Sequence, residues 1–326
     1  MKWFQLVSLI ALVCTGTDAA LAQAVDYPVR QVTVVVPYAA GGGLDVLART
    51  LAQKLSDRLG KPFVVENRPG AGTAIGAASV ARAAPDGYTL MLGTSTPLAI
   101  NATLHRNLPY DPVKDFTPIV LTSNAPFLLL INPQLPVRSV TDLITLANER
   151  PGQLSYGSAG PGSPQHLSYE LFKSMTGTNL VHVPYRGDAP ALTDLVAGHI
   201  STQFAEPTPV LPLLRDGKVR ALAVSSSTRL PPAPDVATVA ESGVPGFDFV
   251  SWQMIVAPAA TPKEIIGKLH AELKTILGLP QIKREFAETG RIAIDSPPVD
   301  ELAMFVRSEI TRLGKIVEFA RIARSQ

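Results

Sequence analysis

Three consecutive glycines, Gly41 to Gly43, stand between a run of valines and a helical pattern of leucines. Glycines let backbone N–H groups approach a ligand, and the N-terminus of a following helix favours an anion. The stretch lacks the GxxxxGK[ST] pattern of a P-loop and the spaced glycines of a dinucleotide fingerprint. It predicts a small anion site, although a tight turn capped by Asp45 explains this loop equally well on its own.

A second glycine-rich turn lies in YGSAGPGSPQHL, residues 156–167, where another predicted strand ends. A helix start is expected near Ser163 and Pro164, so a second helix N-terminus would point beyond a strand end. Ligands of open α/β sheets bind off the carboxyl ends of the strands. Two such loops in two domains therefore predict one anion site between them.

The sequence contains no clear pattern of catalytic residues. No stretch matches GxSxG or HExxH, and the histidines have no metal-ligand spacing. His182 lies in an apolar strand and is interpreted as a core residue, whereas His166 fits a site-facing or a helix-surface position equally well. The one cysteine falls in a predicted leader, so the mature chain has no thiol nucleophile. We expect no catalytic residue, metal or cofactor.

Two acidic residues follow predicted strands in the middle of the chain. Asp188 comes after VPYRG, and Glu206 ends a strand in FAEPTP. A helix cap explains Asp188 and a solvated side chain explains Glu206 without any ligand. If both reached the site, their charge would disfavour a second ligand carboxylate and favour a cationic or hydrogen-bond-donating end.

The N-terminus has the pattern of an export signal. Residues 1–24 hold one lysine, a short apolar run and a small-residue cleavage site, which is too short for a membrane span. The expected mature chain begins at Val25, without lipid, because the residue before Cys14 is a bulky valine. The predicted location of this disulfide-free chain is the bacterial periplasm.

The charge balance argues against a nucleic-acid partner. The formal net charge is +2, from 29 Lys and Arg against 27 Asp and Glu. No basic block or mixture of basic and aromatic residues occurs, so we expect no nucleic acid to bind.

Strand and helix patterns alternate along most of the chain, which is typical of an α/β protein. The opening β-α-β-α-β order predicts a parallel sheet with helices on both faces. Predicted strands are 31–37, 63–67, 88–93, 126–133, 154–158, 180–185, 201–205, 219–226 and 249–258. Predicted helices include 71–83, 139–149, 164–176, 189–198 and one with Thr261 as its N-cap.

Two long apolar strands, near 120–131 and 249–257, bracket a middle block that has its own strands and helices. The simplest topology leaves the first domain at one strand and returns at the other. It gives a discontinuous first domain of residues 25–123 and 248–326, and a second domain of residues 124–247. Two crossings imply a hinge and an interdomain cleft.

The sequence resembles the Bug-type periplasmic receptors, the TctC-like substrate-binding components of tripartite tricarboxylate transport systems. The resemblance covers almost the whole mature chain. It is carried by YPVRQVTVVVPYAAGGGLDVLARTLAQKL, VVENRPGAGTAIGAASVARAAPDGYTLMLGTS, LSYGSAGPGSPQHL, VPYRGDAPALTDLVAGH, VRALAVSSSTRLPPAPDVATVAESGVPGF and WQMIVAP.

The resemblance implies a type II periplasmic-binding-protein, or Venus flytrap, fold: two doubly wound α/β domains joined by two crossover strands. Such a receptor would close on a small carboxylated solute and deliver it to membrane permease subunits. The solute would be an amino acid, a dicarboxylate or an aromatic carboxylate, bound by a monomer. A two-domain enzyme acting on a carboxylate, or a receptor linked to a sensor, is the alternative.

The resemblance also implies which residues contact the solute. By position they are Tyr38, Ala40, Gly42, Gly43 and Asp45 in the first loop, Thr94 and Ser95 after the third strand, and Ser158, Ala159, Gly162 and Ser163 in the second loop. The chain departs from many relatives at Phe204-Ala205-Glu206, where they have an FD pair, and at Asp188, where Gly or Ala is frequent. Asp188 and Glu206 therefore join the candidates at the solute-selecting end.

Overall fold

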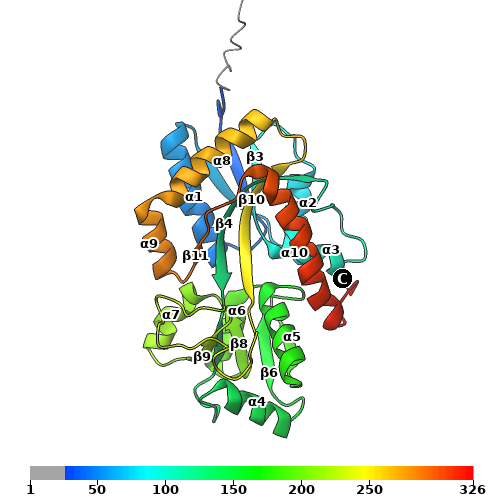
Figure 1. Cartoon of the computed structure of the whole chain (residues 1–326), viewed down its shortest axis with the longest axis vertical. Coiled ribbons are helices and arrows are strands. Elements are labelled where there is room, and N and C mark those ends of the chain that lie inside the picture. The colour runs from blue at the N-terminus through cyan, green and yellow to red at the C-terminus, as the bar shows by residue number, and fades with distance from the viewer. Residues whose placement is uncertain (1–25, 326) are drawn as a thin grey trace, which may run out of the picture.

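The computed structural model describes residues 26–325, which form two α/β domains stacked along the long axis in Figure 1. The predicted leader and its cleavage site lie outside the described residues. No helix in residues 26–325 has the length and apolar character needed to cross a bilayer.

The upper domain is built on a six-stranded sheet with the order β11-β4-β10-β3-β1-β2. Its strands are β1 Val32–Val36, β2 Phe63–Asn67, β3 Thr89–Thr94, β4 Phe116–Pro126, β10 Val250–Pro258 and β11 Ile292–Ala293. Its helices are α1 Gly43–Leu59, α2 Ala74–Ala81, the π-helical turn η1 Thr96–Ile100, α3 Asn101–Leu104, α8 Lys263–Gly278, α9 Pro280–Glu288 and α10 Val299–Phe319.

The lower domain is built on a five-stranded sheet with the order β7-β6-β8-β5-β9. Its strands are β5 Leu128–Ile131, β6 Ser155–Ser158, β7 Val181–Pro184, β8 Thr202–Ala205 and β9 Arg220–Val224. Its helices are α4 Val140–Glu149, α5 Pro164–Thr176, α6 Asp188–Ala197 and α7 Pro207–Arg215.

The parallel opening predicted from the β-α-β-α-β order is confirmed, since β1 pairs in parallel with both β2 and β3. The strand on which the chain enters each sheet from the other domain does not follow this parallel arrangement. β10 runs antiparallel to β3 and β4, and β5 runs antiparallel to β8 and β9. β4 and β10 lie side by side and carry both crossings between the domains (Figure 1). Both sheets are therefore mixed.

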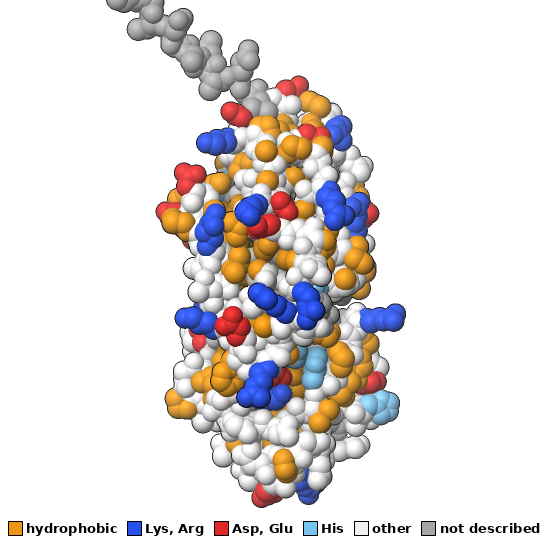
Figure 2. Space-filling view, turned by 90° about the vertical axis from the view of Figure 1, so that its right-hand side faces the viewer, with side chains coloured by type: hydrophobic (Ala, Val, Ile, Leu, Met, Phe, Trp, Pro, Cys, Tyr) orange, Lys and Arg blue, Asp and Glu red, His pale blue; other side chains and the backbone are white. Residues whose placement is uncertain are grey.

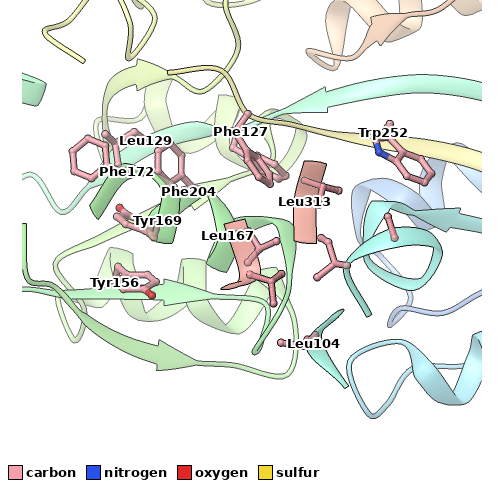
Figure 3. Packing of buried hydrophobic residues seen from close by; sticks show 14 of the residues in the cluster. Leu104, Phe127, Leu129, Tyr156, Leu167, Tyr169, Phe172, Phe204, Trp252 and Leu313 are labelled. Atoms are coloured by element: carbon pink, nitrogen blue, oxygen red, sulfur yellow. The ribbon is translucent and has the colours of Figure 1, made fainter. Parts of the chain in front are cut away.

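A hydrophobic core continues from one domain into the other on the side of α10. Leu104 of α3, Leu313 of α10 and Leu167 of α5 are each fully buried and belong to one apolar cluster. Figure 3 shows these three leucines where the two domains meet, between Trp252 of β10 and the aromatic residues of the lower domain. We call this contact the apolar seam.

One helix start differs from its prediction. The Thr261 hydroxyl donates to the carbonyl of Pro258 at 2.7 Å, and Pro262 occupies the N-cap of α8 without a side-chain hydrogen bond. The prediction of Thr261 as the cap is wrong, because this threonine instead closes the turn that leaves β10.

The surface carries charges of both signs. On the face formed by α10 and α5, basic and acidic side chains are interspersed with neutral and hydrophobic ones (Figure 2). This pattern agrees with the nearly balanced charge of the sequence.

Candidate functional site

The first glycine loop, residues 38–43, connects β1 to α1. Its anchor is Asp45, which is 4% exposed and accepts hydrogen bonds of 3.0 Å each from the Gly41 amide, Arg49 Nε and Asn67 Nδ2. Burial alone would raise the pKa of Asp45, but these donors outweigh it and lower the pKa. The N-cap of α1 is Gly42, so the interpretation of Asp45 as the cap is wrong. Asp45 ties the loop to the end of β2.

The rest of the first glycine loop is exposed. Ala40, Gly41 and Gly42 face solvent, and a Cβ added at Gly42 would meet only a backbone oxygen, 3.9 Å away. A Cβ at Gly43 would lie 2.0 Å from Oε2 of Glu206, which belongs to the other domain. The close approach to this loop is therefore at Gly43, and a protein carboxylate makes it.

Hydroxyl groups gather where β3 ends, beside this loop. The Tyr38 hydroxyl and Thr94 Oγ1 are 2.8 Å apart, and Thr94 Oγ1 also accepts the Thr96 amide at 3.2 Å. Burial raises the pKa of Tyr38, and the nearby Glu206 carboxylate adds to the rise. Ser95 Oγ lies 3.3 Å from Ser251 Oγ. Thr96 Oγ1 is buried with no hydrogen-bond partner in the described part of the chain.

The second glycine loop, residues 158–163, connects β6 to α5 and is mostly buried. Ser158 Oγ accepts the Gly160 amide at 3.1 Å and lies 2.6 Å from His182 Nε2. Ser163 Oγ accepts the His166 amide at 3.3 Å and caps α5. Ala159 is half-buried, and the loop's polar side chains are bonded within their own domain.

Two histidines support the second glycine loop from behind. His166 Nδ1 accepts the Gly162 amide at 3.0 Å, and the His166 and His182 rings stack with centroids 3.9 Å apart. Burial lowers the pKa of His166 to about 4 and that of His182 to about 3. Both rings are therefore neutral near pH 7. His166 lies behind the loop, whereas a site-facing or helix-surface position was expected.

Four polar side chains of the lower domain form a group that we call the acceptor cluster: Gln165, Asp188, Gln203 and Glu206. Asp188 Oδ1 accepts Gln203 Nε2 at 2.7 Å, and Oδ2 accepts the Glu206 amide at 3.4 Å. Burial and the Glu206 charge raise the pKa of Asp188 to about 7. The N-cap of α6 is Gly187 and makes no side-chain bond, so the interpretation of Asp188 as a cap is wrong.

Glu206 crosses to the upper domain. Its Oε2 is buried without a hydrogen-bond partner among residues 26–325 and lies 3.9 Å from Arg291 NH2, which also donates to the Gly43 carbonyl. Thr208, two residues further along the chain, donates to the Thr289 carbonyl at 3.2 Å. The Glu206 side chain is 19% exposed, so its interpretation as a solvated residue is wrong. We call this contact between the domains the polar seam.

The sequence pointed to the loops and to the two acids but missed their partners. Gln165 stands inside the quoted second-loop motif, where a helix N-terminus drew attention to its neighbours instead. Gln203 is a polar residue with 0% exposure in β8, and a polar side chain inside a predicted strand was the only available signal. Arg291 lies far away in sequence, and no local pattern connects it to Glu206.

Other features of the described residues do not form a second candidate site. Trp252 is 2% exposed and its indole nitrogen donates to Glu309 at 2.7 Å, so it is a core residue. No group of three metal-ligating side chains occurs in the part of the chain that the structure describes. A groove of about 790 Å³ between α7, β9 and residues 231–236 is lined mainly by prolines and aliphatic side chains. None of the buried polar atoms without a partner belongs to that groove.

Comparison with protein families settles the class. Residues 47–321 match the model of the tripartite tricarboxylate transporter family receptor, TctC. The chain belongs to the TctC family. This family comprises the substrate-binding receptors of transporters and not enzymes.

Solved structures of other TctC-type receptors share the fold. The R. palustris protein Rpa4515, solved with adipate, is 41% identical, with a TM-score of 0.87 over 91% of this chain and 99% of that one. The periplasmic binding protein BugD is 32% identical, with a TM-score of 0.85 over 91% and 99%. MatC from Rhodopseudomonas palustris, solved with malate, is 35% identical, with a TM-score of 0.83 over 89% and 100%. This TctC chain is thus a Bug-type periplasmic solute-binding receptor with the periplasmic-binding-protein fold.

Proposed function

We propose that this receptor captures a small carboxylated solute between its two domains by hinge closure and delivers it to a tripartite tricarboxylate-type permease. The observation that carries the proposal is that four of the seven buried side-chain atoms without partners in residues 26–325 belong to the acceptor cluster or to the end of β3. Thr96 Oγ1 comes from the upper domain, and Gln165 Oε1, Gln203 Oε1 and Glu206 Oε2 come from the lower domain. Buried polar groups are nearly always hydrogen-bonded, so these atoms mark a place that a ligand or water completes.

The solutes bound by relatives support the proposal that the solute carries a carboxylate. One was solved with adipate and another with malate, and both cover almost this whole chain. The first glycine loop offers exposed backbone groups at the N-terminus of α1, where an anion gains roughly 0.3 to 1 kcal/mol per helix end, so several donors are needed. In the closed form the second glycine loop, which packs on Leu104, would complete the enclosure.

The proposal also covers the boundaries of the two domains and the form of the exported protein. Residues 25–123 and 248–326 would move as one body and residues 124–247 as the other, about the β4 and β10 crossings. Export would remove residues 1–24 and leave a monomeric periplasmic receptor. Solute contacts would come from both glycine loops, Thr94, Ser95 and the acceptor cluster.

The test is mass spectrometry of the solute that co-purifies with the mature protein, followed by a thermal-shift screen of carboxylates. A solute at one hundred times its dissociation constant adds about 2.7 kcal/mol of stability, which is easily seen. A receptor returns its solute unchanged, so turnover by the purified protein would support the enzyme alternative. Failure of every carboxylate to shift the unfolding transition would contradict the proposal.

A further inference from the structure

The acceptor cluster joins side chains from three elements at the edge that faces the upper domain. Gln165 lies in the first turn of α5, Asp188 begins α6, Gln203 lies within β8, and Glu206 directly follows that strand. Gln165 is 5% exposed and Gln203 is 0% exposed. The two amides are therefore buried, and Asp188 and Glu206 are half-buried beside them.

Asp188 fixes the direction of the Gln203 amide. Gln203 directs its Nε2 to Asp188 Oδ1 at 2.7 Å, and the Gln165 side chain lies beside this carboxylate and favours its charged form. Because the Gln203 nitrogen faces Asp188, its oxygen is left for another donor. Gln165 Oε1 and Gln203 Oε1 are buried and have no hydrogen-bond partner in residues 26–325. The cluster thus presents acceptors without donors.

The Arg291 guanidinium beside the acceptor cluster does not satisfy the free acceptors of the cluster. Arg291 is bonded to the Gly43 carbonyl and lies 3.9 Å from Glu206 Oε2. Asp188 makes no ion pair with any residue in 26–325, and its hydrogen-bond donors are Gln203 Nε2 and the Glu206 backbone amide. A cluster of two carboxylates and two free amide oxygens beside one arginine retains an excess of acceptors.

We propose that the acceptor cluster selects an amino carboxylate, whose ammonium group binds here while its carboxylate binds at the glycine loops. The inference rests on the proposed solute-binding function and names the solute class. An ammonium has three donors and no acceptor, so it can satisfy Gln165 Oε1, Gln203 Oε1 and the Asp188 carboxylate together. A second carboxylate at this position would meet only acceptors and like charge.

The discriminating experiment is calorimetric titration of the mature protein with solutes of matched length. The six-carbon set is 6-aminohexanoate, hexanoate and adipate, and the five- and four-carbon sets have the same three end groups. We expect the amino carboxylate to be the tightest member of the set that fits, at least tenfold tighter than its dicarboxylate. Hexanoate and its shorter equivalents report the carboxylate contribution alone.

Asp188→Asn tests the assignment within the cluster, because it keeps the shape and the acceptor for Gln203 but removes the charge. It should reduce the preference for amino carboxylate over dicarboxylate at least tenfold. Asp216→Asn makes the same chemical change on a residue of the same domain whose side chain is 58% exposed. This control should keep the wild-type preference.

The outcomes separate the two proposals. A dicarboxylate that binds as tightly as its amino carboxylate, or an unchanged preference in Asp188→Asn, would overturn the inference and leave carboxylate capture intact. If no member of any set bound, both proposals would fail. Tight amino carboxylate binding that weakens selectively in Asp188→Asn would establish the cluster as the specificity element.

Discussion

The two glycine loops occupy equivalent places in the two sheets, yet they are held in different ways. The second glycine loop is buried and braced by its own domain through Ser158, His166 and His182. The first glycine loop is exposed, is anchored through Asp45, and meets the opposite domain through Gly43 and Glu206. The second glycine loop is thus held by its own domain, whereas the first glycine loop also contacts the opposite domain.

The largest expected effect comes from adding a methyl group to each loop. Gly162 and Gly41 both have positive φ values, +72° and +86°, so alanine costs roughly 1–2 kcal/mol at either position. A Cβ at Gly162 would also lie 2.0 Å from Leu104 across the apolar seam, whereas a Cβ at Gly41 has nothing within 4 Å. Gly162→Ala should lower the free energy of unfolding by about 3 kcal/mol and prevent the closed form. Gly41→Ala should lose only the free energy of the backbone strain. Urea unfolding and solution X-ray scattering would measure both, and equal losses would contradict the difference between the loops.

A second prediction removes the anchor of the first glycine loop. Asp45→Asn replaces an acceptor of three donors with a group that accepts fewer, which should cost about 2 kcal/mol. Asp142→Asn is a control for the same change at a more exposed helix start. A loss in Asp45→Asn no greater than in this control, measured by urea unfolding, would show that the loop is held by other contacts.

Acid should distinguish the two loops. The folded-state pKa of His166 lies below its usual 6.5, so the unfolded chain binds more protons and stability falls as the pH drops from about 6.5 towards 4. The pKa of Asp45 is also lowered, but its contribution is lost only as the pH falls below about 4. Between pH 7 and 5, His166→Gln should therefore remove about 1–2 kcal/mol of the wild-type decline. An unchanged pH slope in this variant would contradict the assignment of a neutral buried His166.

The smallest expected effect concerns Asp188 of the acceptor cluster. Its folded-state pKa of about 7 exceeds the usual 3.8, so the native state binds more protons and stability falls as the pH rises from about 4 through 7. Asp188→Asn should therefore stabilise the solute-free protein by about 1 kcal/mol at pH 8 and by less at pH 5. Thermal unfolding at both pH values checks this, and destabilisation at pH 8 would mean that the charge is already compensated.

Local patterns in the sequence predicted most of the fold. The helix predicted over 164–176 is α5 Pro164–Thr176, because Ser163, Pro164 and Gly177 mark both ends. The direction of β5 and β10 was not predicted, since an apolar run has the same pattern in parallel and antiparallel pairs. Thr261 was assigned to the wrong role because its hydroxyl had a nearer carbonyl partner in Pro258.

The candidate site was predictable only in part. Glycine loops are recognisable because their conformation depends on neighbouring residues. The acceptor cluster and the polar seam depend on contacts between distant segments, such as Glu206 with Arg291 and Gly43. A single sequence contains no local signal for such contacts, so the roles of Asp188 and Glu206 could be posed but not decided.

Hydrogen–deuterium exchange of the mature protein tests the central claim, that one solute joins both loops on closure, most directly. Exchange would be measured by mass spectrometry with and without saturating 6-aminohexanoate, and with adipate for comparison. We predict that the better-binding solute slows exchange in peptides covering both loops. The change should be larger around residues 38–45, because the second glycine loop is already hydrogen-bonded without solute. Protection confined to one domain, or located at the groove between α7 and β9, would contradict the account.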